Sequence, residues 1–133
     1  MIVSSVKEAS DVPKPLHPEQ ILAGSPSPRG RDIGVSPDGN FSCCIWECAA
    51  GSFRYTYNSD EIIHVLEGSA TITPVGGETR TVNAGDVAYF PKGLVTDWVI
   101  KDHVKKLAIH RSQPHTLRSR VKQKIQRLLL GGS

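Results

Sequence analysis

Cysteine is scarce in this chain of 133 residues, and its three cysteines, Cys43, Cys44 and Cys48, fall within six positions. An odd number of thiols cannot pair completely, and no Cys-x2-Cys spacing is present to indicate structural zinc. Cys43 and Cys44 are adjacent, so on a strand their side chains point to opposite faces of the sheet. We therefore expect reduced, buried thiols rather than a disulfide framework.

Long apolar runs are also missing. No stretch approaches the roughly 20 apolar residues that a membrane-spanning helix needs. The segment from Met1 to Ser10 contains Lys7 and Glu8 and has no apolar core of the kind that secretory signals carry. These absences lead to the expectation of a cytoplasmic protein.

Acidic residues are few toward the carboxyl end. Between Lys101 and Arg127 the only acid is Asp102, whereas the rest of the chain has more acidic than basic residues, and the total formal charge is +3. Because the basic excess belongs to one segment, it does not indicate a nucleic-acid-binding domain. No nucleic acid partner is expected.

Within this basic segment, residues 115–130 combine helically spaced apolar side chains with Arg and Lys on the other face. The apolar positions are Leu117, Val121, Ile125, Leu128 and Leu129. We predict that residues 112–133 form a C-terminal basic amphipathic helix. Its apolar stripe can be buried against the domain or a partner subunit, or it can lie on an anionic membrane surface. A tail that stays disordered is the third alternative.

Residues 1–40 hold most of the prolines: Pro13, Pro15, Pro18, Pro26, Pro28 and Pro37. Proline cannot donate a backbone hydrogen bond to a sheet, so this part is predicted to be an irregular N-terminal arm. Residues 18–20 are expected to form one helical turn. The apolar residues 21–23 are expected to hold the arm against the body.

Residues 41–111 are predicted to be an all-β domain, because short runs of β-branched and aromatic residues alternate with turn sequences. The turns include Asn58-Ser59-Asp60, Gly76-Gly77 and Asn83-Ala84-Gly85. The predicted strands are Phe41–Cys48, Phe53–Tyr57, Glu61–Leu66, Ala70–Val75, Arg80–Val82, Val87–Phe90, Thr96–Ile100 and Lys105–His110. Many short strands without helices between them indicate an antiparallel sandwich or barrel.

Two glycine-anchored patterns lie within this region. The first consists of Gly51, Tyr55, Tyr57, Glu61 and Gly68, and the second of Gly85, Asp86, Pro91, Gly93 and Thr96. The spacing resembles the two motifs of the cupin family, Gly-x5-His-x-His-x3,4-Glu-x6-Gly and Gly-x5-Pro-x-Gly-x2-His-x3-Asn. Over about residues 19–111 the chain is similar to small single-domain cupins related to the ureidoglycine aminohydrolase cupin domain and the ethanolamine-utilisation cupin.

This resemblance implies a cupin (RmlC-like) antiparallel jelly-roll β-barrel that is usually a homodimer. In metal-binding cupins the motif histidines and glutamate hold the ion, and the ureidoglycine enzyme binds manganese. Here Tyr55, Tyr57 and Thr96 stand at the three histidine positions. Neutral phenols, with an ordinary pKa near 10, are poor ligands for most divalent ions. We therefore expect no metal ligands and no cofactor. A divalent transition metal would be present only in the alternative case of a metal-dependent enzyme.

Glu61 is the candidate catalytic residue. In an apolar barrel its pKa would be raised, which suits a general acid or base. It could instead orient a ligand by hydrogen bonds, and the purely structural interpretation is that it caps the turn before it or pairs with an Arg or Lys. Tyr55, Tyr57, Thr96 and Trp98 are predicted to line a ligand pocket with Glu61, although aromatic residues also fill the cores of small barrels.

Other residues are expected to be structural. Trp46 is assigned to core packing, and His64, three residues after Glu61, is expected to face away from the pocket. His103, His110 and His115 lie outside the motifs and are interpreted as structural or surface residues.

The leading hypothesis is a metal-free cupin that binds a small polar or anionic metabolite. One alternative is a metal-dependent enzyme of the ureidoglycine aminohydrolase type. Another is a non-catalytic scaffold that docks a partner or a membrane surface through residues 115–130.

Overall fold

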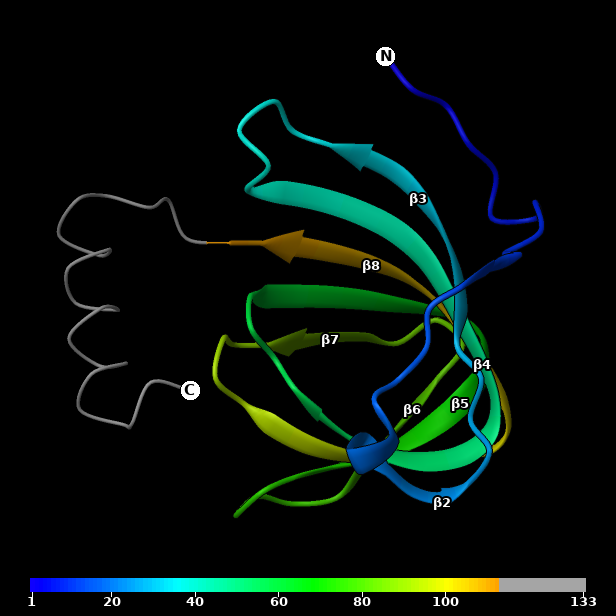
Figure 1. Ribbon diagram of the computed structural model, residues 1–133, viewed down its shortest axis with the longest axis vertical. Coiled ribbons are helices and arrows are strands. Elements are labelled where there is room, and N and C mark those ends of the chain that lie inside the picture. Colours follow the sequence, from blue (N-terminus) through cyan, green and yellow to red (C-terminus); the bar gives the residue numbers. More distant parts are fainter. Residues whose placement is uncertain (113–133) are drawn as a thin grey trace, which may run out of the picture.

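The computed structural model describes residues 1–112, and these form strands with a single short helical turn (Figure 1). The elements are β1 (Val12–Pro13), a 3₁₀ turn (Pro18–Gln20), β2 (Ile21–Gly24), β3 (Arg29–Val35), β4 (Phe41–Thr56), β5 (Asp60–Pro74), β6 (Arg80–Asn83), β7 (Val87–Phe90) and β8 (Val95–Arg111). The predicted all-β class is confirmed. The helix predicted over residues 115–130, with its proposed membrane or partner contacts, lies outside the described residues.

Strands β4, β5 and β8 are much longer than predicted. Each joins two segments that the sequence pattern separates. The joints are β-bulges at Ala49–Gly51 in β4 and at Val65–Glu67 and Gly68–Thr71 in β5. A bulge adds a residue and bends the strand without ending its pairing. The glycines at these joints therefore mark bends within strands rather than turns between them.

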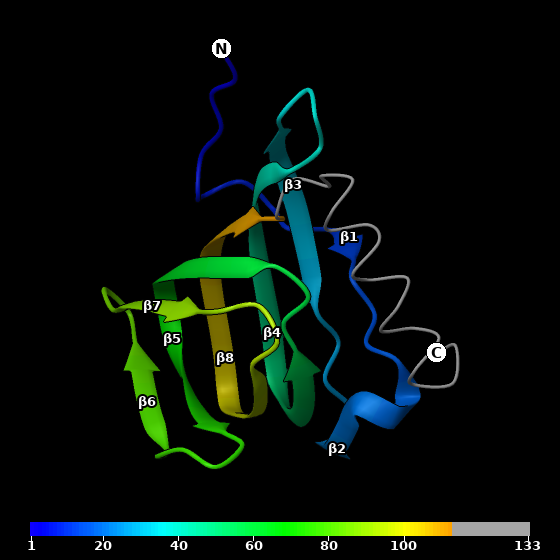
Figure 2. The ribbon, with the colours of Figure 1, turned by 90° about the vertical axis from the view of Figure 1, so that its left-hand side faces the viewer.

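All strand pairs are antiparallel, and the sheet runs in the order β1-β3-β4-β8-β5-β6, with β2 also pairing with β4 and β7 with β5. The long strands bend strongly, so the sheet curls around its inner face (Figure 2). Among residues 1–112, no ladder joins β6 to β1, and the predicted barrel is therefore not closed by hydrogen bonds. The two end strands are short, with two residues in β1 and four in β6.

The N-terminal arm is more regular than predicted. Arg29–Val35 forms strand β3, which pairs with β4 from Arg29 opposite Glu47 to Val35 opposite Ser42. The prediction of an irregular arm is wrong here because residues 29–36 contain no proline and can complete a ladder. The expected helical turn at Pro18–Gln20 and the expected anchoring of residues 21–23, which lie in β2, are both confirmed.

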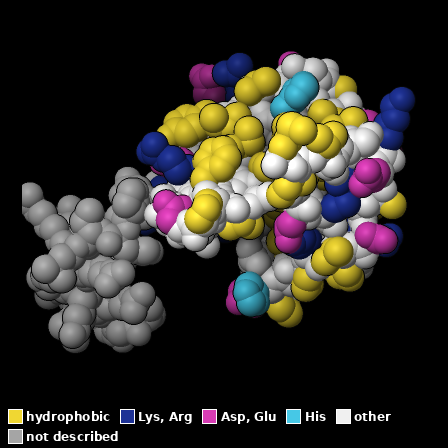
Figure 3. Space-filling view, turned by 90° about the horizontal axis from the view of Figure 1, so that it is seen from above, with side chains coloured by type: hydrophobic (Ala, Val, Ile, Leu, Met, Phe, Trp, Pro, Cys, Tyr) yellow, Lys and Arg dark blue, Asp and Glu magenta, His cyan; other side chains and the backbone are white. Residues whose placement is uncertain are grey.

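The first residues of the chain lie against the outer side of the sheet. Lys105 donates a hydrogen bond to the Val6 carbonyl, and Arg31 donates one to the Ser5 carbonyl. Several apolar side chains at this end stay exposed, and Figure 3 shows hydrophobic side chains gathered on the face seen from above. They are Met1, Ile2, Val3, Val35 and Phe41.

The core lies on the inner face and is built around stacked aromatic rings. Phe53 stacks on Trp98 with ring centroids 5.8 Å apart, and Tyr57 stacks on Phe90 at 4.5 Å. Aliphatic residues from β5 and β8, including Ile63 and Val104, complete this cluster. No helix within residues 1–112 has the length and apolar character needed to cross a membrane.

Candidate functional site

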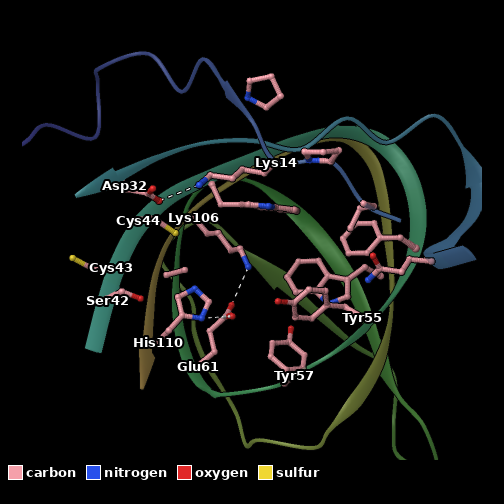
Figure 4. A pocket seen from close by; sticks show the side chains of 18 of the residues that line it. Lys14, Asp32, Ser42, Cys43, Cys44, Tyr55, Tyr57, Glu61, Lys106 and His110 are labelled. Carbon is pink, nitrogen blue, oxygen red and sulfur yellow. Dashed lines mark hydrogen bonds and ion pairs between the residues drawn. The ribbon is translucent and has the colours of Figure 1, made fainter. Parts of the chain in front are cut away.

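A cavity of about 580 Å³ opens on the inner face of the curled sheet (Figure 4). Its walls come from β3, β4, β5 and β8, and residues 13–16 of the arm lie along it. Lys14 of the arm forms an ion pair with Asp32 of β3, with 3.1 Å between Nζ and Oδ1. The arm therefore contributes one side of the pocket, which the sequence pattern did not indicate.

Glu61 lies at the centre of the polar part of this pocket, with its side chain only 3% exposed. Alternation along β5 turns Glu61 inward and leaves His64 exposed on the other face, as predicted. The Oε2 atom of Glu61 is 3.1 Å from the Lys106 ammonium, and Oε1 is 3.0 Å from Nδ1 of His110. Pairing of Glu61 with a basic residue, one of the interpretations left open by the sequence, is thus present.

The charges of these groups are coupled. Burial raises the pKa of the Glu61 carboxyl, but the charges and hydrogen bonds of Lys106 and His110 outweigh it, so the pKa lies below its usual value. Hydrogen bonding with the Cys44 side chain and with Glu61 raises the pKa of His110 to about 9. At neutral pH one carboxylate therefore faces two cations, and the direction of the Glu61 shift is opposite to the one expected from burial alone.

Lys106 is held by aromatic faces as well as by Glu61. Its ammonium lies 4.6 Å from the ring centroid of Trp46 and 5.0 Å from that of Trp98. Cation–π contacts of this kind compensate a buried ammonium for part of its lost hydration. Trp46, which the sequence assigned to core packing, thus also lines the pocket.

Tyr55 and Tyr57 both point into the pocket, as the two-residue spacing predicted (Figure 4). Their rings meet edge to face at 4.8 Å between centroids. Burial raises the pKa of both phenols, and the nearby Glu61 carboxylate adds to the effect. The Tyr57 hydroxyl is fully buried and has no hydrogen-bond partner among the residues that the structure describes.

Thr96 and Trp98 differ in position. Trp98 lines the cavity, although it is almost wholly buried, whereas Thr96 is outside the lining and fully buried in the core. The Trp98 indole donates a hydrogen bond to the Thr96 hydroxyl at 3.1 Å. Thr96 therefore orients a pocket residue instead of lining the pocket.

Three further pocket residues, Cys44, Lys106 and His110, were missed by the sequence reasoning. The sequence contains an alternating pattern that indicates these positions. With the exception of Asp102, every second residue along this part of β8 is buried or half-buried, namely Thr96, Trp98, Ile100, Val104, Lys106, Ala108 and His110. Treating residues 96–100 and 105–110 as separate strands broke this alternation. One continuous strand would have placed Lys106 and His110 on the same face as Trp98.

The donors at the cupin ligand positions do not fit a divalent ion. Glu61 is the one carboxylate there, and its two oxygens already accept hydrogen bonds from Lys106 and His110. An ammonium 3.1 Å from the carboxylate also repels a cation. Over residues 1–112 no group of three or more His, Cys, Asp or Glu side chains is arranged to hold a metal.

Comparison with known proteins supports the cupin resemblance. The family model described as EutQ-like cupin domain matches residues 35–108. A Salmonella typhimurium protein assigned as ethanolamine utilization protein Q is 29% identical, with 63% of this chain and 68% of that chain covered and a TM-score of 0.57. No curated protein matches the chain.

Two more distant structures share the fold alone. The Clostridium difficile EutQ protein is 22% identical, covering 70% of this chain and 75% of that chain, with a TM-score of 0.59. A Pseudomonas syringae protein of unknown function in the DUF861 family is 18% identical, covering 80% of this chain and 46% of that chain, with a TM-score of 0.72. With the family model matching more than half of its length, this chain belongs to the EutQ-like cupin family.

Proposed function

We propose that this cupin binds a small anionic metabolite in the inner pocket without the help of a metal ion. The observation that carries the proposal is the buried group of Lys106, His110 and Glu61, in which two cations surround one carboxylate. The excess positive charge lies in a cavity with aromatic walls, where electrostatic attraction is stronger than in water. A ligand carboxylate is the simplest group to balance it.

Hydrogen-bond capacity in the pocket supports the same choice. An ammonium has three donors, and Lys106 uses one on Glu61. The Tyr57 hydroxyl is a second donor without a protein partner among residues 1–112. A carboxylate that accepts from both satisfies groups that are otherwise costly to bury. The cavity of about 580 Å³ lies within the usual size of small-molecule sites.

Within this proposal Glu61 orients the pocket. Its lowered pKa keeps it ionised at neutral pH, and its two oxygens are both occupied by Lys106 and His110. A permanently ionised carboxylate is a poor general acid. The geometry therefore favours the interpretation in which Glu61 holds two cationic donors in place over the one in which it supplies a proton.

Calorimetric titration with a panel of small mono- and dicarboxylates, each paired with its neutral amide, tests the proposal. We expect at least one carboxylate to bind while its amide does not, and Lys106→Met to weaken that binding by more than about tenfold. His64→Gln, on the outer face of β5, is the matched control and leaves binding unchanged. Equal binding of carboxylates and amides would contradict the proposal.

The metal-free part is tested separately by elemental analysis of protein purified without chelator. We expect well under one transition metal per chain, because the donor set does not fit one. A stoichiometric metal that is lost in Glu61→Ala would favour the alternative of a metal-dependent enzyme of the ureidoglycine aminohydrolase type.

We further propose that the protein is a homodimer. The exposed apolar side chains near the N-terminus, including Val35 and Phe41, support an interface, because burying apolar surface against a second subunit is favourable. The family resemblance also implies a dimer. Light scattering at a chain concentration of about 100 μM should therefore give the mass of a dimer. A monomer mass would count against this proposal.

A further inference from the structure

Cys44 lies beside His110 on the inner face of the sheet. On the β4–β8 ladder Cys44 is directly opposite Ala108, and His110 is two residues further along β8. Diagonal neighbours on one face have Cα atoms roughly 7–8 Å apart, a separation that two side chains can bridge. Figure 4 shows the Cys44 sulfur above the His110 ring, whereas the Cys43 sulfur points away from the pocket.

His110 connects Cys44 to Glu61. Its Nδ1 atom is 3.0 Å from Oε1 of Glu61, which leaves the other ring nitrogen for the Cys44 side. Hydrogen bonding to both partners raises the pKa of the imidazole to about 9. A thiol, an imidazole and a carboxylate in this order form the arrangement that activates nucleophiles in acyl-transfer enzymes of unrelated folds.

We propose that Cys44 is a nucleophile, assisted by His110 and positioned through Glu61, that accepts an activated acyl group from a small anionic ester or thioester. The acyl acceptor is the Cys44 sulfur, and His110 is the group that moves the proton. Glu61 does not contact the substrate and is a positioning residue. Cys43 and Cys48 take no part.

The reaction balances in two steps. As the Cys44 sulfur attacks the acyl carbon and forms a C–S bond, its proton passes to the neutral form of His110. The bond to the leaving alkoxide or thiolate breaks, and the leaving group takes the proton from His110. Water then attacks the acyl-cysteine, and its proton passes through His110 to the Cys44 sulfur, which releases a carboxylic acid and restores the Cys44 thiol and the neutral imidazole.

An independent feature of the same pocket points to a ligand. Tyr57 lines the cavity, and its buried hydroxyl has no hydrogen-bond partner among residues 1–112. With the Lys106 ammonium it supplies a donor for the oxyanion or for the carboxylate of the substrate. The anionic character of the substrate rests on the proposed function, whereas the reactivity of Cys44 rests on Cys44, His110 and Glu61 alone.

The first test uses iodoacetamide on the native full-length chain at neutral pH, with the rate at each cysteine followed by peptide mass spectrometry. Cys43 is the internal control, because it is adjacent, free and, like Cys44, partly exposed. We expect Cys44 to react at least about tenfold faster than Cys43, because His110 lies beside Cys44 and can take its proton as it reacts. Cys48 should be slowest, since burial raises its pKa to about 11. Equal rates at Cys43 and Cys44 would overturn the proposal.

Variants then separate the roles. His110→Gln should lower the Cys44 rate to that of Cys43. An unchanged Cys43 rate distinguishes this outcome from unfolding, which speeds both. Glu61→Gln removes a negative charge, which alone would favour the thiolate and speed the reaction. If Glu61 acts by holding His110, the Cys44 rate falls instead. A faster Cys44 in Glu61→Gln would overturn the positioning role.

Acyl transfer is tested with p-nitrophenyl acetate. We expect a burst of nitrophenolate and an acetyl group on Cys44, both lost in Cys44→Ala and retained in Cys43→Ala. Absence of the acetyl group from Cys44 in the wild-type chain would overturn acyl transfer. Because this probe carries no anionic group, its result is independent of the carboxylate titrations, so failure of one proposal is distinguishable from failure of the other.

Discussion

The Lys106 ammonium lies 3.1 Å from the Glu61 carboxylate, and their side chains are 8% and 3% exposed. Removing two charges from water costs several kcal/mol per ion, of order 5 kcal/mol, and their attraction returns this only when the geometry is good. Such a pair contributes little net stability compared with apolar residues of the same size. Its presence at the centre of a pocket is consistent with the ligand recognition that we propose.

Breaking this pair from one side should be strongly destabilising. Lys106→Met keeps the aliphatic stem between the two tryptophans but leaves Glu61 with His110 as its one cation, so we expect a loss of about 3 kcal/mol in the free energy of unfolding. Adding Glu61→Gln to this variant should recover part of the lost stability, because the buried carboxylate charge is then removed. Urea denaturation measures both effects.

The exposed pair of Arg54 and Asp97, with 2.7 Å between Nε and Oδ1, is the matched control. Surface ion pairs are screened by water, so Arg54→Met should cost much less than Lys106→Met. Equal losses of unfolding free energy in the two variants would show that burial of the Glu61 pair does not increase the cost of breaking it.

Stability should depend on pH through His110. Its folded-state pKa of about 9 lies above the ordinary value of 6.5, so its contribution is fully present below about pH 6.5 and is lost as the pH rises through about 9. The difference in unfolding free energy between wild type and His110→Gln should therefore shrink over this range. Denaturation at closely spaced pH values measures it, and a difference that stays constant from pH 6 to 10 would rule out the raised pKa.

Glu61 acts in the opposite direction. Its pKa lies below the ordinary 4.5, so its contribution is present above that value and is lost as the pH falls through the folded-state pKa. His64→Gln, on the exposed face of β5, should change neither limb of the pH profile.

Gly68 should be intolerant of any side chain. Its φ of +71° is in the left-handed region, and a Cβ would lie 1.9 Å from the carbonyl oxygen of His103. Gly76 has a similar φ of +77°, but a Cβ added there would meet no atom within 4 Å, so this position isolates the backbone effect. We expect Gly76→Ala to cost about 1 kcal/mol and Gly68→Ala clearly more, as measured by thermal or urea denaturation. Equal costs would mean that the close approach of β5 to β8 relaxes freely.

Much of the fold could be predicted from local patterns. Alternation and turn residues located the strands from β4 to β8, and the glycine spacing led to the cupin family. The lengths of β4, β5 and β8 could not be predicted, because a bulge preserves pairing across a sequence that locally looks like a turn. Strand β3 was missed because the surrounding prolines masked a short proline-free segment.

The site was predictable where its residues fall within one strand or motif. Tyr55, Tyr57, Glu61 and Trp98 line the pocket, whereas the partners of Glu61 come from the far end of β8. The register that places His110 opposite Glu61 depends on the bulges, which the sequence did not locate. For the same reason the pKa of Glu61 was expected to rise, since burial was anticipated but its two cationic neighbours were not.

Tyr57 provides a test that separates stability from binding. Its hydroxyl is buried without a partner among residues 1–112, and an unsatisfied buried polar group costs about 1–3 kcal/mol. Tyr57→Phe keeps the stacking on Phe90 and removes this cost, so we expect the ligand-free protein to become more stable by about 1 kcal/mol. If the hydroxyl serves a ligand, the same variant should bind the active carboxylate less tightly. Tyr89→Phe is the control, because within residues 1–112 this exposed phenol reaches only Asp60, at 3.4 Å, and its loss should change neither property. Loss of stability in Tyr57→Phe, with unchanged affinity, would mean that the hydroxyl has a structural partner and no role in recognition.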